Sequence, residues 1–192
     1  MKGRSAIGER NRQTILDAAA PLFRREGIRA VGMDRIVAES GLAKMTLYRQ
    51  FATKDDLVVA YLDRCSASFW AAVEADAARH EAPADRLVAF IDTVIADAAQ
   101  SDSRGCPFTN TQAEFGGLEH RVHAVVRNHA GAVRSYLAKL AREAGLADPR
   151  SVAEQLFIIV DGIYAATRAL GSCPAKSARQ LTNAVISAAR AA

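Results

Sequence analysis

Between Lys44 and Arg49 the sequence gathers two cations, a methionine and two hydroxyl-bearing side chains. On a helix, at 100° per residue, Met45 and Arg49 share one face, with Thr46 on one side and Lys44 and Tyr48 on the other. Arg and Lys pair with guanine edges or phosphates, and Met packs on thymine methyl groups. Thr and Tyr hydroxyls donate to phosphate oxygens. We therefore predict that this face enters a groove of double-stranded DNA, with Lys44, Met45 and Arg49 at base edges.

The residues around this face predict two short helices that meet at a glycine. A first helix is expected over 34–39, and Gly41 supplies the permissive backbone for the corner. A second helix is expected over 43–51, with an inward stripe at i, i+4 and i+8 made of Ala43, Leu47 and Phe51. This layout is a helix-turn-helix. The alternative is a short solvated helix that packs only its Leu and Phe.

The positive charge of the chain is concentrated in the same region. Residues 1–64 contain 12 Lys and Arg against 8 Asp and Glu, whereas residues 65–192 contain 13 of each. The whole net charge of +4 therefore belongs to the first third of the chain. A basic first third and a neutral remainder indicate a polyanionic partner for the first part alone.

From Gly41 to Leu57 the sequence reads GLAKMTLYRQFATKDDL, and this segment resembles the recognition segment of the TetR family of bacterial transcriptional regulators. The Leu-Tyr pair of the family, its Phe and the Lys that opens the next helix fall on Leu47, Tyr48, Phe51 and Lys54. By this resemblance Lys54 joins Thr46 and Tyr48 in contacting phosphates. Two residues depart from the pattern: Gly32 stands where a Thr or Ser often caps the second helix, and Gln50 stands where a His is common.

The resemblance also implies how the chain works. It implies a homodimer, formed through the last two helices, that binds a palindromic DNA operator as a repressor and is released by a small-molecule effector. The sequence agrees on the dimer, because residues 156–166 are apolar nearly all round and both faces of that helix must be covered.

Length and composition limit the other possibilities. The 192 residues, half of them hydrophobic, are enough for one ordinary domain or for one small and one larger unit. No apolar run of about 18 residues and no leader is visible, so we expect a cytoplasmic protein with no membrane partner. No phosphate loop, nucleophile elbow or metal motif appears, so neither an enzyme nor a cofactor is expected. Cys65, Cys106 and Cys173 have no CxxC spacing, and reduced thiols are expected.

The pattern elsewhere predicts an all-α fold of about nine helices. Residues 1–8 are expected to form a mobile arm, followed by a helix over 9–26 that continues through Pro21. Thr53 and Asp56 form a T-x-x-D cap for a long fourth helix. The later helices are expected after a break at Pro83 and up to about Ser101, within 106–117, from Val122 to a stop at Gly145, from Pro149 onward, and over about 175–191. We expect a three-helix DNA-binding head at 1–53 and a larger ligand-binding and dimerisation body at 54–192.

Candidate effector contacts lie in that body. By resemblance, a pocket among the fourth to eighth helices binds the effector, and the candidate lining residues are Phe69, Trp70, Cys106, Phe108, Asn110, Phe115, Asp161 and Tyr164. Ordinary core packing is the alternative for each aromatic residue. Asp161, within an apolar run, either is satisfied by a backbone or Arg168 partner or binds the ligand.

Two further hypotheses concern residues 104–123. Arg104, Gly105 and Cys106, with Asn110 and Glu114 on successive turns, resemble a segment found in a subset of the family. Cys106 follows Arg104 at a helix start, where a dipole and a cation favour a reactive thiolate, so thiol modification is an alternative trigger. His120 and His123 have a spacing compatible with metal binding, but a solvated face is the expectation because no third ligand stands at motif spacing.

Overall fold

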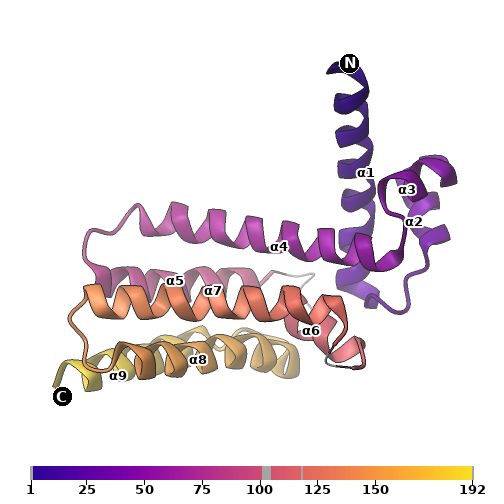
Figure 1. Cartoon of the computed structure of the whole chain (residues 1–192). Coiled ribbons are helices and arrows are strands. Elements are labelled where there is room, and N and C mark those ends of the chain that lie inside the picture. The colour runs from indigo at the N-terminus through magenta and orange to yellow at the C-terminus, as the bar shows by residue number, and fades with distance from the viewer. Residues whose placement is uncertain (1, 101–104, 118, 192) are drawn as a thin grey trace. The chain divides into compact units, whose positions relative to one another are not determined.

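The computed structural model describes residues 2–100, 105–117 and 119–191, and these residues form nine α-helices and no strand (Figure 1). The helices are α1 (Lys2–Glu26), α2 (Met33–Ser40), α3 (Lys44–Gln50), α4 (Lys54–Ala77), α5 (Pro83–Ala98), α6 (Pro107–Glu114), α7 (Arg121–Glu143), α8 (Pro149–Leu170) and α9 (Ala175–Ala191). The predicted all-α class is confirmed. None of these helices is both long and apolar enough to cross a membrane.

Two compact units are built from segments that alternate along the chain. The head unit comprises residues 1–65 and 107–126, and the body unit comprises residues 66–106 and 127–192. Residues 107–126 thus pack with the head, whereas the division at 53/54 expected from the sequence groups them with the body. The motif around α3 predicts where the short helices of the head end, but the sequence holds no local pattern that shows a later segment packing against them. The functional roles of the two units remain predictions.

In the head unit, α1 packs against α2 and α3, and α2 packs against α3 (Figure 1). Ile15, Leu22 and Ile36 lie fully buried between them. The helix α1 continues through Pro21, as predicted. It also includes residues 2–8, so the expected mobile arm is wrong there. Gly3 and Gly8 each disfavour a helix by about 1 kcal/mol, which is too little to end a helix that the following residues already nucleate.

The helix ends in the head follow from local chemistry. Gly41 ends α2 in the left-handed conformation with φ 65°, as expected for the corner of a helix-turn-helix. Gly32 provides no side-chain cap for α2, which confirms the missing hydroxyl. At α4, the Asp56 amide donates to Thr53 Oγ1 at 3.1 Å and the Thr53 amide donates to Asp56 Oδ2 at 2.9 Å. This reciprocal pair is the predicted capping box.

In the body unit, α5 packs against both α8 and α9, and α8 packs against α9 (Figure 1). One face of α5 is buried in this core through Leu87, Phe90, Ile91, Val94 and Ile95. Asp148 accepts a hydrogen bond from the Ser151 amide and precedes Pro149 at the first turn, which confirms the predicted start of α8.

Candidate nucleic-acid interface

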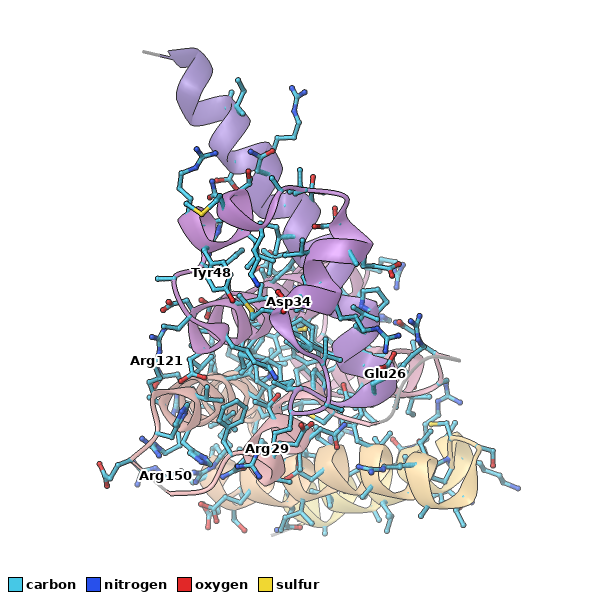
Figure 2. All side chains as sticks on the ribbon, turned by 90° about the vertical axis from the view of Figure 1, so that its right-hand side faces the viewer. Glu26, Arg29, Asp34, Tyr48, Arg121 and Arg150 are labelled. Carbon is cyan, nitrogen blue, oxygen red and sulfur yellow. The ribbon has the colours of Figure 1, made fainter. Side chains whose placement is uncertain are left out.

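The helix α3 has one buried and one exposed face. Leu47 is 0% exposed and Phe51 is 1% exposed, so both anchor the helix in the head core. On the other side Met45 is 80% exposed and Tyr48 is 40% exposed. Tyr48 is labelled in Figure 2. The helical pattern placed Ala43 in the inward stripe, and this is wrong. Ala43 is exposed, because it is the N-cap residue of α3 and has an extended backbone.

We define the recognition face as Lys44, Met45, Thr46, Tyr48 and Arg49. Thr46 is partly exposed, and the four others are exposed. Lys44 already has a partner, because its Nζ lies 2.7 Å from Asp34 Oδ1 on α2. The hydrogen bond and the carboxylate charge raise the pKa of Lys44 above its ordinary value. The structure thus brings together all five residues predicted from their spacing and adds an acidic neighbour.

Lys54, the sixth predicted DNA contact, is placed differently. Its Nζ donates to the backbone carbonyl of Arg29 at 3.3 Å, in the loop between α1 and α2. Burial lowers the pKa of the Lys54 ammonium. Lys54 therefore holds that loop, and phosphate contact remains a prediction for it.

Further side chains fix the three helices of the head, and the sequence pattern did not single them out. The guanidinium of Arg12 lies 4.5 Å from the ring centroid of Phe51, which joins α1 to the end of α3. Arg35 on α2 makes two hydrogen bonds to the Glu26 carboxylate, at 2.9 and 3.0 Å. These contacts hold α2 and α3 on α1. The sequence offers a signal only for the second contact, since Glu26 at the end of α1 and Arg35 on α2 carry opposite charges.

The histidine pair at the start of α7 is bound within the head unit. His120 Nε2 lies 3.1 Å from Asp55 Oδ2, and His123 is only 3% exposed. The His123 Nε2 lies 3.0 Å from the carbonyl of Phe115, which can only accept, so Nε2 carries the proton. The expected solvated face is therefore wrong for His123, whose ring is buried with Nε2 on the Phe115 carbonyl, while His120 is partly exposed. Within the part of the chain described, no group of three His, Cys, Asp or Glu residues could hold a metal ion.

In the body unit, two of the predicted effector contacts join an aromatic cluster. The Phe69 and Trp70 rings lie 5.5 Å apart edge to face, and Trp70 lies 5.4 Å from Tyr136. His129 stacks edge to face on Phe69 at 5.5 Å, and its Nδ1 lies 3.0 Å from Ser66 Oγ. Desolvation lowers the pKa of His129 to about 4. His129 and Tyr136 were missed, because single aromatic residues on a helix carry no pattern of their own.

Tyr164 and Cys106, two other candidates, also belong to the body unit. Tyr164 is 7% exposed and its hydroxyl donates to Asp97 Oδ2 at 2.7 Å. Burial and the Asp97 carboxylate raise the pKa of this phenol. Cys106 is partly buried immediately before α6, and Arg104 lies outside the described residues. No disulfide joins Cys65, Cys106 or Cys173, and their reduced state stays a prediction.

The remaining effector candidates divide between the two units, and Asp161 belongs to the body unit with Tyr164, whose phenol pKa its carboxylate helps to raise. Phe108, Asn110 and Phe115 belong to the head unit, where Phe108 is buried and the Phe115 ring lies 4.8 Å from that of His120. Asp161 lies on the exposed side of α8, where partial desolvation raises the pKa of its carboxyl. Effector contact by each of these residues stays a prediction.

Two family profiles cover most of the chain. The profile described as bacterial regulatory proteins, tetR family, matches residues 15–61, which include α2 and α3. The profile described as tetracyclin repressor-like, C-terminal domain, matches residues 83–182.

Individual proteins agree with these profiles. The uncharacterized HTH-type transcriptional regulator Rv0472c of Mycobacterium tuberculosis is 30% identical over 176 residues, which span 88% of this chain and 71% of that protein. A second regulator of that species, MT1294, is 31% identical over 103 residues, so the chain spans about half (51%) of its length. The crystal structure of SCO4454, a TetR-family transcriptional regulator from Streptomyces coelicolor, superposes with a TM-score of 0.86 at 30% identity, covering 93% of this chain and 95% of that one.

These matches cover both the helix-turn-helix and the helical body. The recognition face lies within residues 15–61, which the first profile matches. They also confirm that the chain is not an enzyme, because the family consists of regulatory proteins. The chain belongs to the TetR family of bacterial transcriptional regulators.

Proposed function

We propose that this chain is a homodimeric repressor that binds a palindromic DNA operator and is released from it by a small-molecule effector. The main observation in support of DNA binding is that α3 has one buried face and one exposed face. Leu47 is 0% exposed, while Met45, next but one along the helix, is 80% exposed. An apolar side chain that projects into solvent between two cations is suited to contact base edges and methyl groups.

The proposed dimer forms through an exposed stripe on α8 and α9. The large apolar side chains exposed on these helices are Ile158 at 69%, Leu170 at 68% and Leu181 at 57%. The same two helices also expose small residues, namely Gly162, Ala165, Ala169, Ala184 and Ala188. Small residues let two helices approach closely, and an apolar stripe of this extent favours burial against a second copy. A two-fold dimer places two copies of α3 in successive major grooves, about 34 Å apart.

The effector is proposed to bind in the body unit beside the aromatic cluster. Phe69 and Trp70 are only partly buried there, so ring surface remains for a ligand. His129 carries no charge at neutral pH, and the nearby rings are apolar. These properties favour an uncharged or weakly polar molecule with aromatic or aliphatic surface. Cytoplasmic location is proposed with this function, because the operator is there.

DNA binding is tested with the full chain and the DNA upstream of its own coding region. We expect that fragment to bind much more tightly than random DNA of the same length at physiological salt, since specific sites bind about 10³-fold or more above non-specific DNA. A nuclease footprint is expected to cover two half-sites of an inverted repeat. Weak binding with no preference between the two DNAs contradicts the proposal.

Effector binding is tested through Trp70, the single tryptophan of the chain. A panel of uncharged aromatic and aliphatic compounds is screened for a change in Trp70 emission, and each positive compound is then added to the complex with DNA. We expect some of them to release the DNA. The variant Trp70→Phe is the control, because it silences the signal while keeping an aromatic ring. Compounds that shift the emission without releasing DNA count against the effector role.

The competing trigger is modification of the Cys106 thiol, at the residue before α6. It predicts that an electrophile or oxidant releases DNA from the wild type but not from Cys106→Ser. The matched control is Cys173→Ser, which leaves Cys106 in place. Release of DNA by the same reagent from Cys106→Ser contradicts this trigger.

A further inference from the structure

A carboxylate from α6 holds the loop that leads into the helix-turn-helix. Glu114 Oε1 accepts from the Ile28 amide at 3.0 Å, and Glu114 Oε2 accepts from the Arg29 amide at 2.6 Å. Two consecutive backbone amides that converge on one carboxylate form charge-assisted hydrogen bonds, which are about twice as strong as neutral ones. The contact joins residues 85 positions apart in the sequence.

The loop is shaped to receive this carboxylate. Gly27 ends α1 with φ 88°, a backbone conformation that residues with a Cβ rarely adopt. A Cβ at Gly27 would lie 3.0 Å from Glu114 Oε1, so glycine is needed both for the turn and for the approach of the carboxylate. Ile28 and Val31 on the same loop are buried, at 3% and 0% exposure. The loop is therefore fixed on one side by the core and on the other by Glu114.

The same segment holds the start of α4. Arg121 lies 2.8 Å from Asp56, and His120 lies 3.1 Å from Asp55 (Figure 2 labels Arg121). Hydrogen bonds from Thr53 and Arg121 keep the pKa of Asp56 below its ordinary value. Residues 107–126 thus contact the first part of the head unit at two places, the loop before α2 and the start of α4. The helix-turn-helix lies between these two places in the sequence.

We infer that Glu114 is a positioning residue for DNA binding, which sets the orientation of α2 and α3 without touching DNA. This inference rests on the proposed function. It follows from the contacts above, because α2 begins four residues after Arg29 and carries Asp34, the partner of Lys44. Loss of the carboxylate leaves two loop amides without their acceptor, and the loop is then free to change the direction in which α2 starts.

The test compares Glu114→Gln with Glu119→Gln, an exposed acidic residue that follows α6. Both variants remove one negative charge from the same segment, and by electrostatics alone both would bind DNA slightly more tightly, at most about twofold. Glutamine at position 114 has nearly the same volume, but its amide group places a donor against a backbone donor. Positioning therefore predicts the opposite sign, a loss of affinity for Glu114→Gln of roughly two- to thirtyfold.

The DNA probe is a duplex that the wild type selects from a random-sequence library, and binding is measured over a range of salt. We expect Glu114→Gln to lose affinity with an unchanged salt slope, since it removes no phosphate contact. Amide exchange at Ile28 and Arg29 is expected to be faster in Glu114→Gln and unchanged in Glu119→Gln. Affinity equal to that of Glu119→Gln, or exchange equal to that of the wild type, overturns the inference.

Two results separate this inference from the proposed function. If the wild type selects no duplex, the proposed function fails, while amide exchange still reports whether Glu114 holds the loop. If Glu114→Gln does not fold, Glu114→Asp keeps the charge on a side chain one methylene shorter. A folded Glu114→Asp with reduced affinity supports the inference, and one with wild-type affinity overturns it.

Discussion

Asp34 and Lys44 form an ion pair across the corner of the helix-turn-helix, with 2.7 Å between Asp34 Oδ1 and Lys44 Nζ. Both side chains are exposed, so the pair contributes little to folding. The ion pair matters for the proposed DNA binding, because Lys44 can contact DNA only after its ion pair with Asp34 has been broken. We therefore expect Asp34 to compete with DNA for Lys44, the first residue of α3.

The first prediction follows from this competition. Asp34→Asn removes the competing carboxylate, and we expect DNA affinity to rise roughly two- to fivefold, the range that exposed ion pairs support. The control Glu39→Gln removes an exposed negative charge from the same helix without freeing Lys44. Equal gains in the two variants, measured by fluorescence anisotropy at one salt concentration, would mean that Asp34 acts only through its charge.

The second prediction concerns base readout by Arg49. Arg49→Ala is expected to lose about 1 to 3 kcal/mol of binding to the selected duplex and to relax the preference at one position of each half-site. The control Arg25→Ala removes an exposed cation from the last turn of α1. If Arg49→Ala lowers affinity equally for all sequences and reduces only the salt slope, Arg49 contacts a phosphate.

The third prediction is a pH dependence of folding stability from His129. Its pKa falls from 6.5 to about 4 in the folded chain, because burial disfavours the charged ring. The unfolded chain therefore binds this proton more readily between those values, so stability is lost as pH falls from 6.5 towards 4. With allowance for the partial exposure of the ring, the loss is on the order of 1 to 3 kcal/mol.

This pH dependence is measured by urea unfolding of the wild type, His129→Gln and His80→Gln at pH 7 and pH 5. His129→Gln is expected to lose less stability than the wild type between the two pH values. The control His80→Gln removes another imidazole from the body unit and should lose as much as the wild type. An unchanged pH dependence in His129→Gln would assign the effect to other groups.

The fourth prediction concerns the proposed dimer. Ile158→Glu places a carboxylate in the middle of the exposed stripe of α8, so association would bury two uncompensated charges. We expect the dimer to weaken by roughly tenfold or more in sedimentation, with a parallel loss of operator affinity. The control Ala72→Glu adds the same charge at an exposed position of α4. A dimer that survives Ile158→Glu must form through another surface.

The sequence alone was enough for the parts of the fold that depend on near neighbours. Helical spacing, the corner at Gly41, the Thr53 and Asp56 capping box and the start of α8 at Asp148 all involve residues within about four positions. The recognition face is of this kind too, since a helix puts Met45 and Arg49 on one side whatever surrounds it. The resemblance to a family rests on the same local segment.

Only the tertiary structure decided which distant residues support that face. Glu114 reaches two loop amides across more than 80 positions, and Lys54 turns to a backbone carbonyl instead of remaining exposed. His123 is buried although its spacing suggested a solvated side. Such contacts depend on how helices far apart in the chain pack, and a helix presents the same periodic pattern whichever neighbour it meets. The sequence by itself therefore predicted the residues that would contact DNA, because they share one helix face, and packing determined which residues hold that face in place.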